Sequence, residues 1–243
     1  MTTTHQETGP LVIIACGALV RELRALTAQL GDRLGEHSMT VLPAPLHNRP
    51  ERIPAAVDDA IAEQLDATAD AGGPAPRFLL GYADCGTGGL LDAVIDRRRA
   101  DGVVVERIPG AHCYEFFAGS DVFAAEMEAE LGTFFLTDYL ARHFDTLIWQ
   151  AYRLDRHPEL RNALFGAYRR VVHLTQTDDP VQRARLHDLA ADAAGRLGLT
   201  FEHRHTGLSP LRDVLVPIVA STLEDPADPC PTPLPESCPE DPN

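Results

Sequence analysis

The sequence predicts an α/β protein with a mostly parallel, Rossmann-like sheet of six to seven strands and helices on both faces. Short apolar runs alternate with longer amphipathic segments along the whole chain. Several of these runs are hydrophobic throughout rather than at every second position, which is typical of strands buried on both faces of a parallel sheet. Consecutive parallel strands need a crossover between them, and the amphipathic segments are of the right kind to provide it.

Each expected element follows from a local pattern. A strand is expected where a short, mainly apolar run stands alone, and a helix where apolar residues recur every three or four positions. The expected strands cover residues 11–16, 39–42, 77–83, 103–108, 133–137, 170–175 and 199–207. The expected helices cover residues 18–31, 54–71, 87–99, 112–119, 121–132, 138–154, 158–165, 180–197 and 210–223.

Several expected helices begin or end at residues that favour a helix boundary. Gly31 and Gly72 stand where a helical pattern stops, and Pro54 stands where one begins. Ser120 is expected to cap the helix that follows it, and Asp138 opens a long helix of 17 residues, DYLARHFDTLIWQAYRL. These signals fix the order of the elements but not the order of the strands in the sheet.

Length and composition suit one folded domain. The chain has 243 residues, 44% of them hydrophobic and 23% charged. We expect residues 1–9 to be a flexible N-terminus and residues 10–223 to be a single α/β domain. Residues 224–243 are rich in proline and acid and are expected to be disordered.

Charge and the absence of targeting patterns narrow the function. A net charge of −15 and a pI near 5.0 argue against nucleic acid or an anionic membrane as a partner. The first residues are polar, and no apolar run reaches the roughly 18 residues that span a bilayer. We therefore expect a cytoplasmic protein in which thiols stay reduced, so that cysteines serve as ligands, catalytic groups or small core residues.

Three cysteines stand where a predicted strand gives way to a loop. They are Cys16, Cys85 and Cys113, and each has a glycine, acid or histidine nearby. Ligands bind beyond the carboxyl ends of parallel strands. Three thiolates and an imidazole, either His47 or His112, can hold zinc, and three thiolates can hold a four-iron cluster with one iron open. The simpler alternative is that each is a small buried residue beside a turn.

Polar residues with catalytic potential follow the same strand ends. The candidate acid–base groups are Asp84, His112, Glu115 and Asp138. His112, next to Cys113, can also ligate a metal or lower the pKa of the thiol. For Asp138 the simpler alternative is the start of a helix and a surface ion pair.

Two further segments are candidates for binding an anion. One is the start of the third helix, where free amides attract phosphate or carboxylate, at Thr87, Gly88 and Gly89. The other is a loop with an imidazole, an amide and two guanidinium groups, at His47, Asn48, Arg49 and Arg52. The alternatives are a tight turn that only caps a helix, and surface arginines that pair with the abundant acids.

Six segments together carry a resemblance to a known family. The motifs ACGAL, LHNRPERIP, GYADCGTGG, PGAHCYEFFAG, FFLTDYLARHFD and QTDDP occur in that order, from about Leu11 to Leu215. This combination resembles the uncharacterised DUF1638 domain family, whose members are bacterial and archaeal and have no activity to transfer. Beyond the fold, the resemblance implies a genomic setting, because similar genes are often found beside those for corrinoid proteins and methyltransferases of the trimethylamine type. The resemblance therefore implies a link to one-carbon metabolism.

Three functions remain open at this point. The first is a metal-binding enzyme or accessory protein of corrinoid-linked methyl metabolism, with an iron–sulfur cluster or zinc on the three cysteines. The second is a metal-free enzyme in which Cys85 or Cys113, activated by His112, acts on a small anionic substrate. The third is a non-enzymatic partner of a corrinoid protein or methyltransferase.

Overall fold

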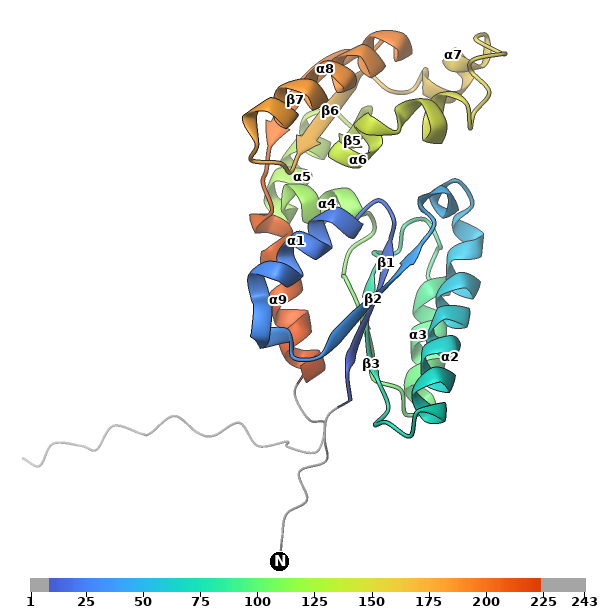
Figure 1. Cartoon of the computed structure of the whole chain (residues 1–243). Helices are drawn as coiled ribbons and strands as arrows, with labels where there is room; N and C mark the ends of the chain where they lie inside the picture. Colours follow the sequence, from blue (N-terminus) through green and yellow to red (C-terminus); the bar gives the residue numbers. More distant parts are fainter. Residues whose placement is uncertain (1–8, 224–243) are drawn as a thin grey trace, which may run out of the picture.

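The seven strands of the described chain form two parallel sheets rather than the single sheet expected from the sequence. The structure is a computed structural model that describes residues 9–223. The first sheet has the order β2-β1-β3-β4 and the second the order β5-β6-β7 (Figure 1). The strands are β1 (Leu11–Cys16), β2 (His37–Leu42), β3 (Arg77–Gly81), β4 (Val105–Arg107), β5 (Thr133–Thr137), β6 (Arg170–Thr175) and β7 (Thr200–His205).

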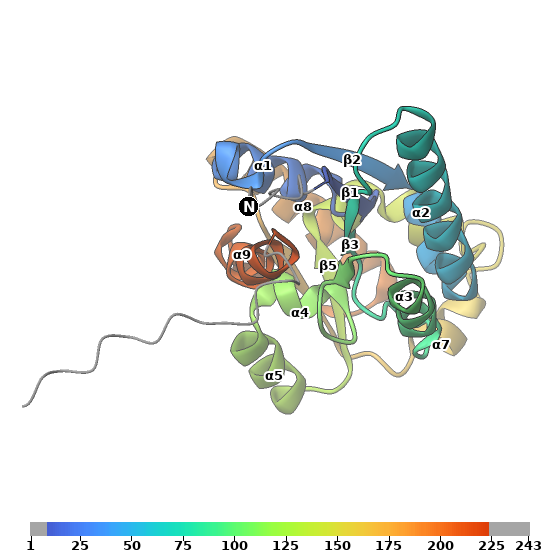
Figure 2. The same cartoon turned by 90° about the horizontal axis from the view of Figure 1, so that it is seen from below.

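Helices cover both faces of the four-stranded sheet, as predicted. One face is covered by α1 (Val20–Leu30) and α9 (Ser209–Leu223), the other by α2 (Ile53–Asp70) and α3 (Leu90–Ala100) (Figures 1 and 2). Leu211 and Leu215 of α9 belong to the same hydrophobic core as β1. The last helix of the described residues therefore returns to the first sheet and ties the two ends of the described fold together.

The three-stranded sheet is also covered on both faces. Val171 of β6 packs in one core with α8 (Pro180–Leu197), while its neighbour Val172 packs in the core of the first sheet. Successive strand residues point to opposite faces, so the two cores lie on opposite sides of this sheet. The other helices near it are α4 (Cys113–Ala118), α5 (Ser120–Ala129), α6 (Asp138–Arg142) and α7 (Leu160–Phe165).

Helix α4 explains why the chain builds two sheets. It lies between β4 and β5 in the sequence, and Phe116, Phe117 and Ala118 in its short span are all buried. A helix that is apolar on several sides needs partners on several sides. It packs against α9 and against β5 and β6, and so separates the second sheet from the first (Figure 1). Alternation of strands and helices does not specify which strands pair, and the one-sheet prediction was wrong for that reason.

The long helix expected over residues 138–154 is divided into α6 and a π-helix, η4 (Asp145–Trp149). The wider turn places Phe144 and Trp149, five residues apart, on the same guanidinium. The Arg196 guanidinium lies 5.1 Å from the ring centre of Phe144 and 4.3 Å from that of Trp149, and it also pairs with Asp145 at 2.7 Å. These contacts favour the local widening over a regular helix.

Three 3-10 segments complete the described chain: η1 (Gly31–Leu34), η2 (Ala44–Asn48) and η3 (Pro50–Arg52). The expectation that Ser120 caps α5 was wrong, because Gly119 occupies the N-cap and the Ser120 hydroxyl donates to Glu115 instead. No helix within residues 9–223 combines the length and apolar character needed to cross a bilayer.

Candidate functional site

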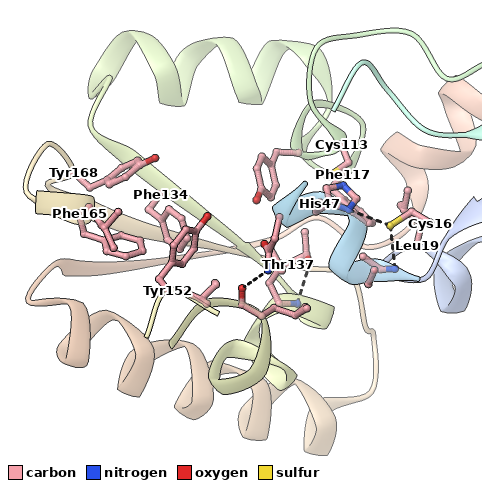
Figure 3. Close-up of a pocket in the computed structure, with 18 residues that line it drawn as sticks. Cys16, Leu19, His47, Cys113, Phe117, Phe134, Thr137, Tyr152, Phe165 and Tyr168 are labelled. Atoms are coloured by element: carbon pink, nitrogen blue, oxygen red, sulfur yellow. Dashed lines mark hydrogen bonds between the residues drawn. The ribbon is translucent and has the colours of Figure 1, made fainter. Parts of the chain in front are cut away.

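A pocket of about 280 Å³ lies between the two sheets. One side of it is built by the end of β1, by η2 and by α4, and the other side by β5, α6, η4 and α7. Two groups of side chains face it from opposite ends (Figure 3). Cys16, His47 and Cys113 form one group, and aromatic residues around Phe134 and Phe165 form the other. It is a concave, mostly apolar site with a few polar groups, as expected of a small-molecule site.

Parallel pairing brings Cys16 next to His47. Cys16 is the last residue of β1 and pairs in register with Leu42, the last residue of β2. The segment after β2 therefore turns back over the end of β1, and η2 places the His47 Nδ1 atom 3.4 Å from the Cys16 sulfur. The Ala18 amide also donates to this sulfur, at 3.4 Å.

Both members of this pair are held in their neutral forms. Burial raises the pKa of the Cys16 thiol to about 12, against a smaller lowering by the Ala18 amide. Burial also lowers the pKa of His47. The pair is therefore a thiol beside a neutral imidazole at pH 7, not a thiolate–imidazolium pair.

The buried hydroxyl of Tyr82 adds a polar group behind the pair. Its electrostatic interaction with Cys16 contributes to the raised pKa of Tyr82, although burial is the larger cause. The hydroxyl makes no hydrogen bond of full geometry within residues 9–223. The Tyr82 ring also stacks on the His47 ring, with ring centres 6.4 Å apart. Tyr82 thus packs the imidazole against the end of the sheet.

The other two cysteines come from neighbouring turns. Cys85 lies in the turn between β3 and α3 with φ of 51°, a left-handed conformation that is uncommon for a residue with a side chain. Its amide donates to the Ala111 carbonyl at 3.0 Å, which ties this turn to the loop just before Cys113. Cys113 is the first residue of α4 and lines the pocket, whereas Cys85 lies outside its lining.

The three thiols interact electrostatically with one another. Burial, followed by the charge of Asp84, raises the pKa of Cys85 to about 11. The pKa of Cys113 lies well above its usual value because of burial, and ionised Cys85 and Cys16 would raise it further. Within residues 9–223, however, no three His, Cys, Asp or Glu side chains already surround a common point in the manner of metal ligands. The donor types fit a metal, but the side chains are not arranged around one.

Asp84 occupies the site where an external anion was expected. Its carboxylate accepts hydrogen bonds from the amides of Gly86 and Gly88 at 3.2 Å and of Gly89 at 2.8 Å, and from the Thr87 hydroxyl at 2.7 Å. The Gly89 amide and the Thr87 hydroxyl are the main reasons that the pKa of Asp84 lies below its usual value. The cradle at the start of α3 therefore holds a carboxylate of the chain itself, and an external anion would have to displace it.

The expected arginine loop is divided between the pocket and the surface. His47 and Asn48 line the pocket, and the Asn48 amide donates to the Leu147 carbonyl in η4 at 3.1 Å. Arg49 and Arg52 are exposed and are not part of the pocket lining. The loop thus contributes an imidazole and an amide to the pocket but neither guanidinium.

Two of the proposed acid–base groups also lie outside the pocket. His112 is exposed at the N-cap of α4, and Glu115 accepts from Ser120 at 3.2 Å. Among the described residues, the cysteine–histidine contact in this region is that of Cys16 with His47. The sequence-based pairing of His112 with Cys113 therefore has no contact to support it.

Asp138 belongs to a separate buried network at the end of the second sheet. Its carboxylate accepts from the amides of Gln176 and Thr177 and lies 3.2 Å from Nε2 of His173. The Thr175 hydroxyl continues the network toward His203. The burial and the bonds of Asp138 explain it as the anchor between β5 and the loop after β6, not as a group of the pocket.

Sequence reasoning missed the aromatic wall of the pocket. Phe134, Tyr152, Phe165 and Tyr168 pack against one another, with ring centres 5.2–6.1 Å apart. Nothing in the spacing of these rings along the sequence links them to a site. They come together because β5, α7 and the turn after η4 meet at one place.

Comparison with known proteins gives one result. No curated protein and no solved structure matches the chain. The family model that matches covers residues 41–215 and is described as "Protein of unknown function (DUF1638)". The matched region contains Cys85 and Cys113 and begins after Cys16. Since it spans well over half of the sequence, the chain belongs to the DUF1638 family.

Proposed function

We propose that this chain is a metal-dependent enzyme, or a metal-bearing accessory protein, that acts on a small molecule in the pocket between its sheets. Cys16, Cys85 and Cys113 would supply the thiolates, and His47 is the candidate for a fourth ligand. One observation carries the proposal: three thiols from three strand ends lie close enough for each to affect the ionisation of another.

The protonation of these thiols favours a metal over a free nucleophile. The pKa values of about 12 for Cys16 and about 11 for Cys85 leave very little thiolate at neutral pH. A bound cation reverses this, because a coordinated thiol gives up its proton. The metal-free alternative also required His112, which is exposed and outside the pocket lining.

The Cys16–His47 contact is compatible with a shared metal. Zinc bonds to sulfur at about 2.3 Å and to imidazole nitrogen at about 2.0 Å, so two such ligands of a tetrahedral ion lie about 3.5 Å apart. The observed separation between Cys16 Sγ and His47 Nδ1 is 3.4 Å. The cysteine side chains would then have to turn toward a common point, since residues 9–223 contain no completed ligand group.

Two chemistries fit such a centre. Zinc bound by thiolates can activate a thiol as an acceptor of a methyl group, and a cluster held by three cysteines keeps one iron open to a substrate. The resemblance to a family found beside corrinoid proteins favours methyl metabolism as the setting. A non-enzymatic role as partner of a corrinoid methyltransferase system would use the same centre without turnover.

Metal analysis of anaerobically purified protein tests the proposal. We expect about one zinc ion, or about four iron atoms with a brown visible spectrum, for each chain. Cys16→Ser, Cys85→Ser and Cys113→Ser should each lower the metal content. The matched control is the Cys230→Ser/Cys238→Ser double variant, at positions outside the described residues, which should retain it. Folded wild-type protein without metal after aerobic and anaerobic preparation, even when supplied with zinc and iron, would contradict the proposal.

A further inference from the structure

We infer that the pocket binds an uncharged molecule with an apolar, ring-sized body, whose polar end lies beside Cys16 and His47. This inference deepens the proposed function. It rests on that proposal in one respect, namely that the pocket is the functional site. The inference names a ligand class different from the small anion that the sequence suggested.

The charge of the lining is the first argument. No Asp, Glu, Lys or Arg is among the residues that line the pocket in the described chain. Three charged groups that the sequence suggested for a binding site do not reach the pocket. Asp84 is bonded within its own turn, while Arg49 and Arg52 are exposed outside the lining. A charged ligand would lose its hydration without gaining an ionic partner among the side chains of the lining, and this loss opposes binding.

The distribution of polar groups is the second argument. Cys16, His47 and Cys113 lie at one end of the pocket, and the rings of Phe134, Phe165, Tyr152 and Tyr168 lie at the other (Figure 3). A ligand that fills both ends needs a polar head and an apolar body. Two other polar groups of the lining, those of Asn48 and Thr137, are already used in part, because Asn48 donates to Leu147 and Thr137 accepts from Leu140.

The geometry of the aromatic end is the third argument. Phe134 meets Phe165 at an interplanar angle of 87° and Tyr168 at 72°, and Tyr152 meets Phe165 at 87°. Such edge-to-face contacts present both ring faces and ring edges, and a further ring can pack on them. The volume of about 280 Å³ is near the lower end of ligand pockets, which limits the body to about the size of one substituted ring.

One residue at the rim of the pocket can be substituted to reverse the expected preference for an uncharged ligand. The Leu164 side chain in α7 lines the pocket and has a relative exposure of 41%, so a longer polar side chain there can reach water. Leu164→Arg would add the positive charge that the lining lacks. Leu131→Arg makes the same change at an exposed leucine that does not line the pocket, and it serves as the matched control.

A series of three near-isosteric probes tests the inference. Benzamide, benzoate and benzamidinium share one ring and differ in charge, and their binding to the full chain can be measured by ligand-observed NMR titration. We expect benzamide to bind at least tenfold more tightly than either ion. Leu164→Arg should shift the preference toward benzoate by about tenfold or more, and Leu131→Arg should leave it unchanged.

Three results would overturn the inference. Benzoate binding as tightly as benzamide would indicate an anion site, and tighter binding of benzamidinium would indicate a cation site. Failure of benzamide to bind up to its solubility limit would show that the pocket does not take this class of ligand. The metal content of the same samples separates the two proposals: metal without benzamide binding contradicts only this inference, and benzamide binding without metal contradicts only the metal centre.

Discussion

The Cys16 sulfur lies 3.4 Å from Nδ1 of His47, yet the two groups do not form an ion pair. Burial raises the pKa of the thiol to about 12 and lowers the pKa of the imidazole. Proximity of a cysteine to a histidine is therefore not enough to activate it here. Water exclusion decides the protonation state, and it favours two neutral groups until a cation or another ligand enters.

The first prediction concerns thiol reactivity. In metal-free folded protein, Cys16 should react with iodoacetamide about a thousandfold more slowly at pH 8 than the same cysteine in urea-unfolded protein, because its pKa rises from 9.0 to about 12. Mass spectrometry of the labelled peptides gives the rate for each cysteine. Labelling of Cys16 at the unfolded rate would show that its thiol is ionised or exposed and would contradict the description of the pair.

The second prediction concerns stability at alkaline pH. The folded state keeps Cys16 and Cys85 protonated above pH 9, where the unfolded chain ionises, with folded pKa values of about 12 and about 11. Their contribution to stability is complete below pH 9 and is lost as the pH rises toward 11 and 12. Each thiol then lowers the free energy of unfolding by up to about 1.4 kcal/mol for every pH unit.

Urea denaturation of metal-free protein between pH 7 and 11 measures this dependence. Cys16→Ala should lose stability at all pH values but should show a shallower decline above pH 9. Cys230→Ala, outside the described residues, is the control for removal of a thiol. Equal slopes for wild type and Cys16→Ala would mean that the Cys16 thiol ionises alike in the folded and unfolded states.

Local sequence patterns were sufficient to predict most of the elements. LVIIAC became β1 with the expected bounds, and the run from Arg170 to Thr175 became β6. Pairing could not be predicted, because an apolar strand gives no sign of which neighbour it will join. The buried helix α4 gave one sign of this, since Phe116 and Phe117 are adjacent, point about 100° apart around the helix and are both buried.

The candidate site could be predicted only where the course of the backbone decides which residues come together. Strand ends carry Cys16, Cys85 and Cys113 to one region because β1 and β3 are neighbours and the turn after β3 is hydrogen-bonded to the loop after β4. That Asp84 binds the amides of its own turn could not be predicted, because it depends on the direction of its side chain. The aromatic wall depended on the approach of the second sheet, which no short motif encodes. The sequence alone therefore could not assign residues such as Phe165 to the pocket.

The third prediction concerns the buried ion network that attaches α5 to the second sheet. Arg170 donates to Glu126 of α5 at 2.9 Å and to Glu202 of β7 at 3.0 Å, and both Arg170 and Glu126 are buried. Arg170→Ala leaves Glu126 buried with only Arg204 to neutralise it and should cost about 3 kcal/mol or more. Urea denaturation at pH 7 measures the cost.

Arg169→Ala is the matched control for this prediction. Arg169 is the preceding residue and is exposed, and its side chain donates to the backbone carbonyls of Gly166 and Tyr168. Its removal should cost less than about 1 kcal/mol. Similar losses for the two variants would show that the ion network adds nothing beyond ordinary surface contacts.

The fourth prediction uses the carboxylate that fills the anion cradle. The pKa of Asp84 lies below 3.8, mainly through the Gly89 amide and the Thr87 hydroxyl, so its stabilisation is complete at neutral pH and fades as the pH falls below that value. Asp84→Ala removes the acceptor of three amides and a hydroxyl and should lower stability at pH 7 by about 1–3 kcal/mol. The same change empties a cradle of amides at the start of α3, where an anion is favoured.

Phosphate should therefore raise the thermal unfolding temperature of Asp84→Ala more than that of the wild type, in which Asp84 already holds these amides. Sodium chloride at equal ionic strength controls for general salt effects, because screening acts on both proteins alike. Asp84→Asn, which keeps an acceptor in place, should respond less than Asp84→Ala. An equal phosphate response in wild type and Asp84→Ala would place the anion elsewhere, for example at Arg49 and Arg52, and would remove the cradle from consideration as a binding site.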